Sequence, residues 1–340
     1  MRTYIASGWL TVILLALASL SVAERAQAET QKPKYKPALI YLYSGEDTDS
    51  AFINSARIGI EKAQNEFHVP VTVTRMSAAE DISAVIKRVA DSGASPIIAL
   101  GNQYVAPVLN LAERYPRTNF TVIDGLVPPL YPNVQSILFK DHEGAFLIGL
   151  IAGKTTKTDF VGFVGGMDLP IIRNFAQGYT QGVKYANADV AVHVQMTGTT
   201  PDAWSNPEQA RSIALTQYRE GADVIFAAAG GSSIGVLKAA DEMGKLAIGV
   251  DTNQNGLYPG HVLTSLVKRV DIAVYDSLKN SVEGSWNPGI KYLGIKEGAL
   301  DYAVDQNNRS LISEKLIEEV ATAKDKIISG KITVEQYTPK

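Results

Sequence analysis

The regular alternation of short apolar runs with amphipathic segments is the feature that most constrains the fold of this chain. Residues 38–43 form an apolar, aromatic-rich run, and residues 50–66 carry apolar side chains at helical spacing. The same order continues with expected strands at 69–74, 96–100 and 119–123, separated by expected helices at 82–92 and 105–114. Strands that alternate with helices predict a parallel sheet covered by helices on both faces.

A second series of the same kind begins after Gly144. It opens with an expected helix at 144–154 and an expected strand at 160–164, which Gly165 and Gly166 are predicted to end. It continues with expected helices at 171–186, 207–220 and 233–244 and expected strands at 190–195, 222–228 and 247–250. Two series of similar size predict two similarly built lobes, and a chain of 340 residues is too long for one ordinary core.

The N-terminus has the pattern of an export signal. Arg2 supplies a positive charge, residues 9–18 are almost uninterruptedly apolar, and Ala26-Gln27-Ala28 has the small-x-small pattern of a cleavage site. A membrane anchor needs about 20 apolar residues, and this run is shorter. We therefore expect residues 1–28 to be a cleavable signal peptide. Because the sequence contains no cysteine, we also expect a freely diffusing periplasmic protein without a lipid anchor.

Charge and motifs exclude several classes of function. The net charge is −3, and cleavage at residue 28 makes it more negative, which argues against nucleic acid as a partner. A helix follows the glycine-rich run 230–235, but the lysine of a phosphate-binding loop is missing. The four histidines lack the spacing of metal ligands, and no nucleophile elbow is present. We expect neither an enzyme nor a metal or cofactor site.

The candidate site follows from a topological rule, because ligands of open α/β sheets bind beyond the carboxyl ends of the strands. The residues that follow the expected strands are rich in carboxylates, aromatic rings and glycine amides. They are Asp49, Phe52, Asp124, Trp204, Gly230, Gly231, Asp251 and, further along, Lys268.

These residue types suit a ligand with a sugar and a flat ring. Asp251 can accept hydrogen bonds from vicinal hydroxyls to which Lys268 donates. Phe52 and Trp204 can stack on a base, at about 1–3 kcal/mol for each ring. Asp124 or Asp49 can accept a hydrogen bond from a ring N–H. A structural alternative remains for two of them, since Phe52 also fits a helix core and Asp49 a helix N-cap.

Several stretches together resemble a known family. They are residues 143–147 (EGAFL), 161–173 (VGFVGGMDLPIIR), 221–226 (GADVIF) with 229–231 (AGG), 248–251 (IGVD) and 263–271 (LTSLVKRVD). The chain resembles the basic membrane protein family, also called the purine nucleoside receptor A-like family, from about Pro37 to near the C-terminus. The members are substrate-binding components of ABC-type nucleoside importers.

The resemblance implies a type I periplasmic-binding fold, with two Rossmann-like lobes whose parallel sheets are joined by a three-segment hinge. We expect residues 36–142 and about 252–290 to form the N-terminal lobe. Residues 143–251 and about 291–340 would form the C-terminal lobe. The resemblance also implies a purine nucleoside between the lobes, an ABC permease in the inner membrane as partner, a monomer and no catalytic step.

The family's site roles carry over where the motifs match. Asp251 and Lys268 resemble the ribose contacts, with the Gly230-Gly231 backbone beside the sugar. Phe52 and Trp204 resemble the two stacking rings, and Asp124 a base contact. The segment Thr48-Asp49-Ser50-Ala51-Phe52-Ile53-Asn54 stands where many relatives have Asp-Asp-Lys-Ser-Phe-Asn-Gln. Ribose recognition is therefore expected to be intact, while the preferred base stays open.

Other functions fit parts of the pattern. The same binding module can act as a sensor that signals to a membrane kinase or chemoreceptor, and the fold can also take a plain sugar. A nucleoside hydrolase would need clustered carboxylates for a metal or an activated base. The acidic residues of this sequence are spread over separate loops, which favours hydrogen bonding to a ligand over catalysis.

Overall fold

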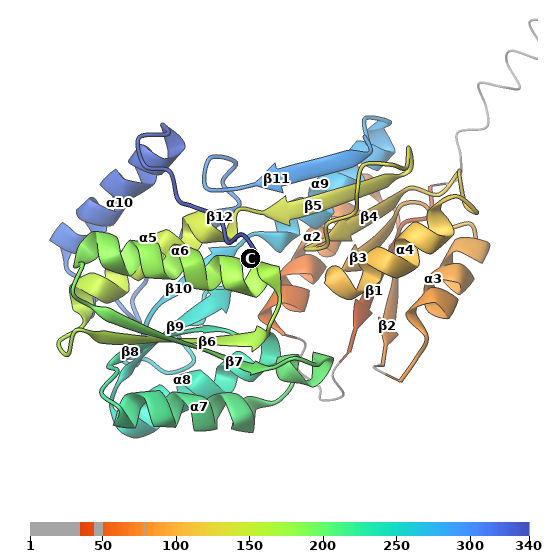
Figure 1. The fold of residues 1–340 in the computed structure, drawn as a ribbon. Helices are drawn as coiled ribbons and strands as arrows, with labels where there is room; N and C mark the ends of the chain where they lie inside the picture. Colours follow the sequence, from red (N-terminus) through yellow and green to blue (C-terminus); the bar gives the residue numbers. More distant parts are fainter. Residues whose placement is uncertain (1–34, 44–49, 78, 340) are drawn as a thin grey trace, which may run out of the picture.

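The protein forms two lobes, each built around a six-stranded sheet (Figure 1). The computed structural model describes residues 35–43, 50–77 and 79–339. The predicted signal peptide and Asp49 lie outside these residues. The prediction of an α/β protein with two mainly parallel sheets is confirmed.

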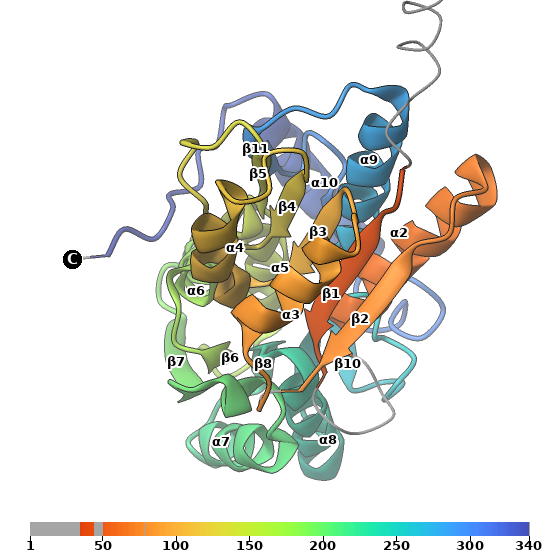
Figure 2. The same ribbon diagram turned by 90° about the vertical axis from the view of Figure 1, so that its right-hand side faces the viewer.

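The sheet of the first lobe has the strand order β11-β5-β4-β3-β1-β2, and each neighbouring pair is parallel. Its strands are β1 (Ala38–Leu42), β2 (Thr72–Met76), β3 (Ile97–Leu100), β4 (Phe120–Ile123), β5 (Val134–Phe139) and β11 (Gly289–Leu293). Its helices are α2 (Ala51–Phe67), α3 (Ile82–Asp91), α4 (Val105–Ala112) and α9 (Val270–Glu283), with the short 3-10 helix η1 (Asn102–Tyr104). Figure 2 shows α3 and α4 on one face of this sheet.

The sheet of the second lobe has the order β12-β10-β9-β8-β6-β7, and β12 is antiparallel to β10. Its strands are β6 (Phe160–Met167), β7 (Ala191–Gly198), β8 (Val224–Ala228), β9 (Leu246–Asp251), β10 (Val262–Lys268) and β12 (Leu300–Tyr302). Its helices are α5 (Asp141–Thr155), α6 (Pro170–Ala186), α7 (Pro207–Arg219), α8 (Ser233–Met243) and α10 (Glu314–Ile328), with the 3-10 helices η2 (Pro201–Trp204) and η3 (Gly230–Ser232).

Burial on both faces explains why strands such as β1, β3 and β8 are apolar throughout. In β1, Leu39 and Tyr41 belong to one buried cluster, while Ala38 and Ile40 belong to another on the opposite face. Successive side chains of a strand point to opposite faces, so a sheet covered on both sides needs apolar residues at every position. Some helices begin at a polar cap, as α3 does at Asp81, whose carboxylate accepts a hydrogen bond from the Ser83 amide (2.8 Å).

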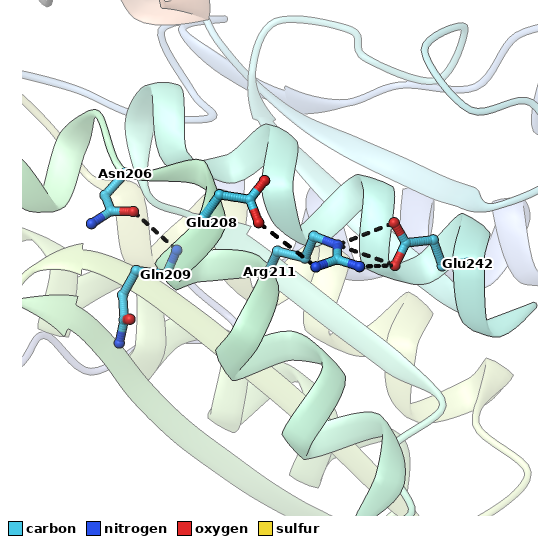
Figure 3. Close-up of polar contacts among 5 residues, drawn as sticks. All are labelled: Asn206, Glu208, Gln209, Arg211 and Glu242. Atoms are coloured by element: carbon cyan, nitrogen blue, oxygen red, sulfur yellow. Dashed lines mark hydrogen bonds and ion pairs between the residues drawn. The ribbon is translucent and has the colours of Figure 1, made fainter.

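Helices α7 and α8 pack against each other on one side of the second sheet (Figure 1), and polar side chains connect them (Figure 3). The side chain of Asn206 caps α7 by accepting a hydrogen bond from the Gln209 amide (3.0 Å). Arg211 on α7 donates to Glu242 on α8 (2.6 Å) and lies 3.7 Å from Glu208. The Arg211–Glu242 pair is partly exposed to solvent, and such pairs add little to stability.

Glycines let α5 and α6 approach within backbone contact. A Cβ atom at Gly149 would meet the carbonyl of Tyr179, and one at Gly182 would meet the carbonyl of Phe146. The α5 helix follows the first connection between the lobes, so this contact fixes α6 to the hinge.

We expect Gly182→Ala to lower the free energy of unfolding by about 1–3 kcal/mol, the usual cost of overpacking a close contact. Helix propensity alone would favour alanine by about 1 kcal/mol. Urea unfolding of the variant measures the change. Gly256→Ala is the control, because its added Cβ would be 3.5 Å from the nearest atom, Asn307 Nδ2. An unchanged or raised stability of Gly182→Ala would contradict the close packing.

Three connections join the lobes: β5 to α5, β10 to α9, and β11 to β12. They contact one another, since the Lys140 amide donates to the Leu293 carbonyl and the Arg269 amide to the Ala299 carbonyl, both at 2.9 Å. The predicted lobe boundaries need correction. β10 pairs with β9, so the chain returns to the first lobe after Lys268 and not near residue 252. β11 pairs with β5, so the last segment of the first lobe reaches Leu293.

Two local predictions were also wrong. Gly165 and Gly166 do not end a strand, because β6 continues to Met167. A Cβ atom at Gly166 would meet the ring of Trp204, so glycine here makes room for a side chain and does not mark a turn. The strand predicted at 69–74 lies at Thr72–Met76 instead.

Candidate functional site

The predicted site residues that the structure describes lie at the carboxyl ends of strands or just beyond them. Asp124 follows β4, while Asp251 and Lys268 are the last residues of β9 and β10. Gly230 and Gly231 form η3 after β8, Trp204 ends η2 after β7, and Phe52 lies in the first turn of α2. Figure 1 shows β5 of the first lobe and β6 of the second pointing toward each other's lobe.

Lys268 is the centre of a buried charge cluster that joins the lobes. Its side chain is 2% exposed, and its Nζ donates to Asp124 Oδ2 of the first lobe at 2.6 Å. The same Nζ lies 3.1 Å from Asp141 Oδ1, at the start of α5. Burial lowers the pKa of a lysine, but the charges of Asp124, Asp141 and Asp251 outweigh it and hold this pKa above the usual value. The ammonium group therefore stays charged although it is buried.

Aromatic rings from both lobes surround the same ammonium group. Lys268 Nζ lies 4.6 Å from the ring centroid of Phe139, 5.3 Å from that of Phe175 and 5.7 Å from that of Phe52. The face of an aromatic ring attracts a cation within about 6 Å of its centroid. Phe52 therefore lies beside the predicted ribose contact, and it also packs against the apolar core.

Asp124 and Asp251 share an unusual backbone conformation. Their φ angles are +59° and +69°, in the left-handed region that residues other than glycine seldom adopt. Such strain persists only where surrounding structure holds it, and it is concentrated at functional sites. Each residue turns the chain at the end of a strand, and the two strands belong to different lobes.

The carboxylates of the cluster have strong hydrogen-bonding capacity. Burial raises the pKa of Asp251 to about 6, with Lys268 opposing this shift and Asp124 adding to it. Asp124 Oδ1 is buried and accepts no hydrogen bond from any residue in the described ranges. A buried acceptor without a donor is costly, so a ligand that donates to this oxygen gains affinity.

Asp141 is a member of the cluster that the sequence did not reveal. Its side chain is fully buried. Burial raises its pKa to about 8, against the opposing charge of Lys268 and with Asp124 and Asp251 adding to the rise. In the sequence it is an acidic residue in the first turn of a helix, where acidic residues are common because of the helix dipole. No local signal distinguishes it from such a residue.

Trp204 forms a second part of the site with the glycines. A Cβ atom at Gly230 would lie 3.3 Å from Trp204 Cε3, and one at Gly231 would lie 3.0 Å from the Trp204 carbonyl oxygen. Gly230 has a φ of +57°, which favours glycine. Helix α2, which carries Phe52, lies against both η3 and β9 and so connects the two parts.

The arrangement offers charge, hydrogen bonds and aromatic faces. Within the described ranges, no group of three or more His, Asp or Glu side chains suits a metal ion. No helix in the same ranges has the length and apolar character needed to cross a bilayer.

Residues 36–338 match the family described as ABC transporter substrate-binding protein PnrA-like. The chain belongs to this family. Basic membrane protein A of Borreliella burgdorferi is 30% identical over 96% of this chain and 94% of its own length. A protein of Pyrococcus horikoshii named as a lipoprotein is 31% identical, over 86% of this chain and 76% of its own. The solved ABC transporter solute-binding protein of Aeropyrum pernix K1 is 27% identical, with a TM-score of 0.81 over 89% of this chain and 94% of that one.

The comparisons confirm two predictions made from the sequence. The resemblance to the basic membrane protein family is confirmed by the family match and by the names of the relatives. The type I periplasmic-binding fold is confirmed by the solved solute-binding protein. Membership in this PnrA-like family implies a small-molecule ligand and a permease partner.

The comparisons also correct one prediction. We expected a freely diffusing periplasmic protein without a lipid. Relatives from Pyrococcus horikoshii, Pyrococcus abyssi and Pyrococcus furiosus are named lipoproteins, and those from Borreliella are named basic membrane proteins. These names point to lipidated, membrane-anchored proteins and contradict that expectation. That expectation rested on the absence of cysteine from this sequence.

Proposed function

We propose that the protein captures a purine nucleoside between its lobes and passes it to the permease of an ABC-type importer, without catalysing a reaction. The observation that carries this proposal is the buried cluster around Lys268, which combines one ammonium group with carboxylates from both lobes and from the hinge. A ligand that exchanges hydrogen bonds with this cluster contacts both lobes at once. It stabilises the closed form by its higher affinity for that form.

Each part of the nucleoside is assigned to the residues whose chemistry suits it. Asp251 and Lys268 bind the ribose hydroxyls as acceptor and donor, and the Gly230-Gly231 backbone lies beside the sugar. Phe52 stacks on the base from α2, where it borders the cluster, and Trp204 stacks on it from η2, beside the Gly230-Gly231 loop. Asp124, whose Oδ1 atom is buried without a donor among the described residues, accepts a hydrogen bond from the base. Asp49 is assigned to the base only from its place in the sequence.

Calorimetric titration of the refolded monomer tests this function. The panel contains inosine, guanosine, adenosine, cytidine, uridine, the free bases, ribose and galactose. Saturable binding of a purine nucleoside, with ribose inert, supports the proposal. Binding of a plain sugar with every nucleoside inert would reject the nucleoside while keeping the binding role.

We expect inosine 5′-monophosphate to bind at least about 100-fold more weakly than inosine, because like charges brought together cost several kcal/mol. Asp124, Asp141 and Asp251 already surround one ammonium group, so the cluster has no positive charge left to neutralise a phosphate. The control is 5′-O-methylinosine, which adds bulk at the same atom without charge. Equal weakening by the methyl and the phosphate groups would mean that space, and not charge, excludes nucleotides.

A further inference from the structure

Asp141 occupies a position that none of the proposed ligand contacts shares. It is the first residue of α5, directly after the first connection between the lobes, whereas Asp124 lies in the first lobe and Lys268 ends the last β-strand before the second connection. Lys268 Nζ lies 2.6 Å from Asp124 Oδ2 and 3.1 Å from Asp141 Oδ1, so one ammonium group is shared between a lobe and the hinge. Both Asp141 oxygens are buried, and apart from the contact between Oδ1 and Lys268 Nζ, neither has a hydrogen-bond donor in the described part of the chain.

We infer that Asp141 is a positioning residue. It competes with Asp124 for the ammonium group of Lys268, and its protonation state sets how strongly Lys268 holds the two lobes together. Ionised Asp141 competes with Asp124 for the ammonium group. Protonated Asp141 leaves that group to Asp124, and the bond between the lobes becomes stronger. The inference rests on the proposed function only in one respect, which is that a nucleoside serves as the probe in the binding measurement.

The surrounding groups make Asp141 the one that titrates near neutral pH. The charged groups that face it are Lys268 of β10, Asp124 after β4 and Asp251 of β9. Lys268 keeps its charge, and the pKa of Asp251 is lower, at about 6. On its own helix, burial lowers the pKa of His142 to about 4, so this imidazole stays neutral over the same range. The other side chains around Lys268, Phe52, Phe139 and Phe175, do not titrate.

The sign of the pH effect follows. Burial raises the pKa of Asp141 to about 8, so acidification from about pH 9 to about pH 6.5 protonates it. We expect the lobes to close further over this change. Adenosine, whose base does not titrate in this pH range, should bind about tenfold more tightly, which is within the usual range of coupling between two sites. In Asp141→Asn, the same size without charge, both quantities should stay at the wild-type values of pH 6.5.

Lobe closure can be measured without a ligand. Because the chain has no cysteine, Ala84→Cys on α3 and Ser212→Cys on α7 supply two labelling sites, one on each lobe. Both residues are exposed. The distance between two spin labels is recorded against pH in the wild-type background, in Asp141→Asn and in Glu242→Gln. Glu242→Gln is the control, since it removes a carboxylate from the ion pair between α7 and α8 (Figure 3).

Each outcome of the distance measurement either supports or overturns the inference. A pH-dependent distance in the wild type and in Glu242→Gln, with a constant short distance in Asp141→Asn, supports it. A wild-type distance that does not change between about pH 6.5 and about pH 9 overturns it without any variant. A pH dependence that survives in Asp141→Asn also overturns it. If no nucleoside binds the wild type, the proposed ligand fails, and the label distances still test Asp141.

Discussion

Replacing Lys268 by methionine is expected to abolish nucleoside binding and to lower the free energy of unfolding by about 3–5 kcal/mol, the usual cost of leaving a buried charge without its partner. Methionine is similar in length and fits among Phe52, Phe139 and Phe175. The loss is therefore one of charge and of hydrogen-bond donors. Calorimetry with inosine and urea unfolding measure the two effects.

The stability of Lys268→Met should also depend on pH in a defined direction. The ammonium group opposes the effect of burial on Asp141 and Asp251, so its removal raises the pKa of both carboxyls further. A carboxyl whose folded pKa is raised contributes stability at low pH and loses it as the pH rises through that pKa. The difference in Tm between Lys268→Met and wild type should therefore be small near pH 4 and grow toward pH 8.

A matched control distinguishes the effect of removing Lys268 from the cluster from the effect of removing a lysine elsewhere. Lys154→Met removes an ammonium group whose ion pair with Glu319 is 3.2 Å long, with both side chains more than a third exposed to solvent. We expect this variant to bind inosine as the wild type does, at every pH. Retention of nucleoside affinity by Lys268→Met within about threefold would contradict the central role of the cluster, since it corresponds to less than 1 kcal/mol.

The fold was largely predictable because strand and helix patterns differ in period and because parallel strands are apolar throughout. The missing strand β5 and the misplaced return to the first lobe share one cause. β4 and β5, and likewise β9 and β10, are parallel neighbours with no helix between them. Without an amphipathic segment, the sequence does not show that both strands belong to the same sheet. That is why β5 was not predicted and why the return to the first lobe was placed before β10.

The candidate site was predictable to the extent that it depends on strand ends. Asp124, Asp251 and Lys268 end strands or follow them directly, and the topological rule finds such positions from the order of elements alone. Asp141 does not follow from this rule, because it starts a helix in the hinge. Its role depends on burial and on the approach of β10, which are tertiary properties. The left-handed conformations of Asp124 and Asp251 also have no sequence signal of their own.

The second large effect is expected from Trp204→Ala, which should weaken inosine binding by about 5- to 150-fold, the equivalent of about 1–3 kcal/mol for one stacked base. Because stacking depends on the area of the base, uridine should lose less affinity than inosine, and the preference for purines should shrink. Trp204→Phe keeps an aromatic face and should restore most of the binding. Calorimetric titration with both nucleosides compares the two variants with the wild type.

Trp204 also packs against Gly166 and Gly230, so its removal opens the wall of the site as well as deleting a ring. The purine-to-pyrimidine ratio distinguishes these effects, since a disturbed wall weakens both nucleosides alike whereas lost stacking weakens inosine more. Trp286→Phe is the control for the loss of a tryptophan. Its indole donates to Thr121 Oγ1 (3.1 Å) within the first lobe. If Trp204→Ala weakens inosine and uridine equally, or neither, then Trp204 supports the glycine loop, and the base must be held by Phe52 and Asp124.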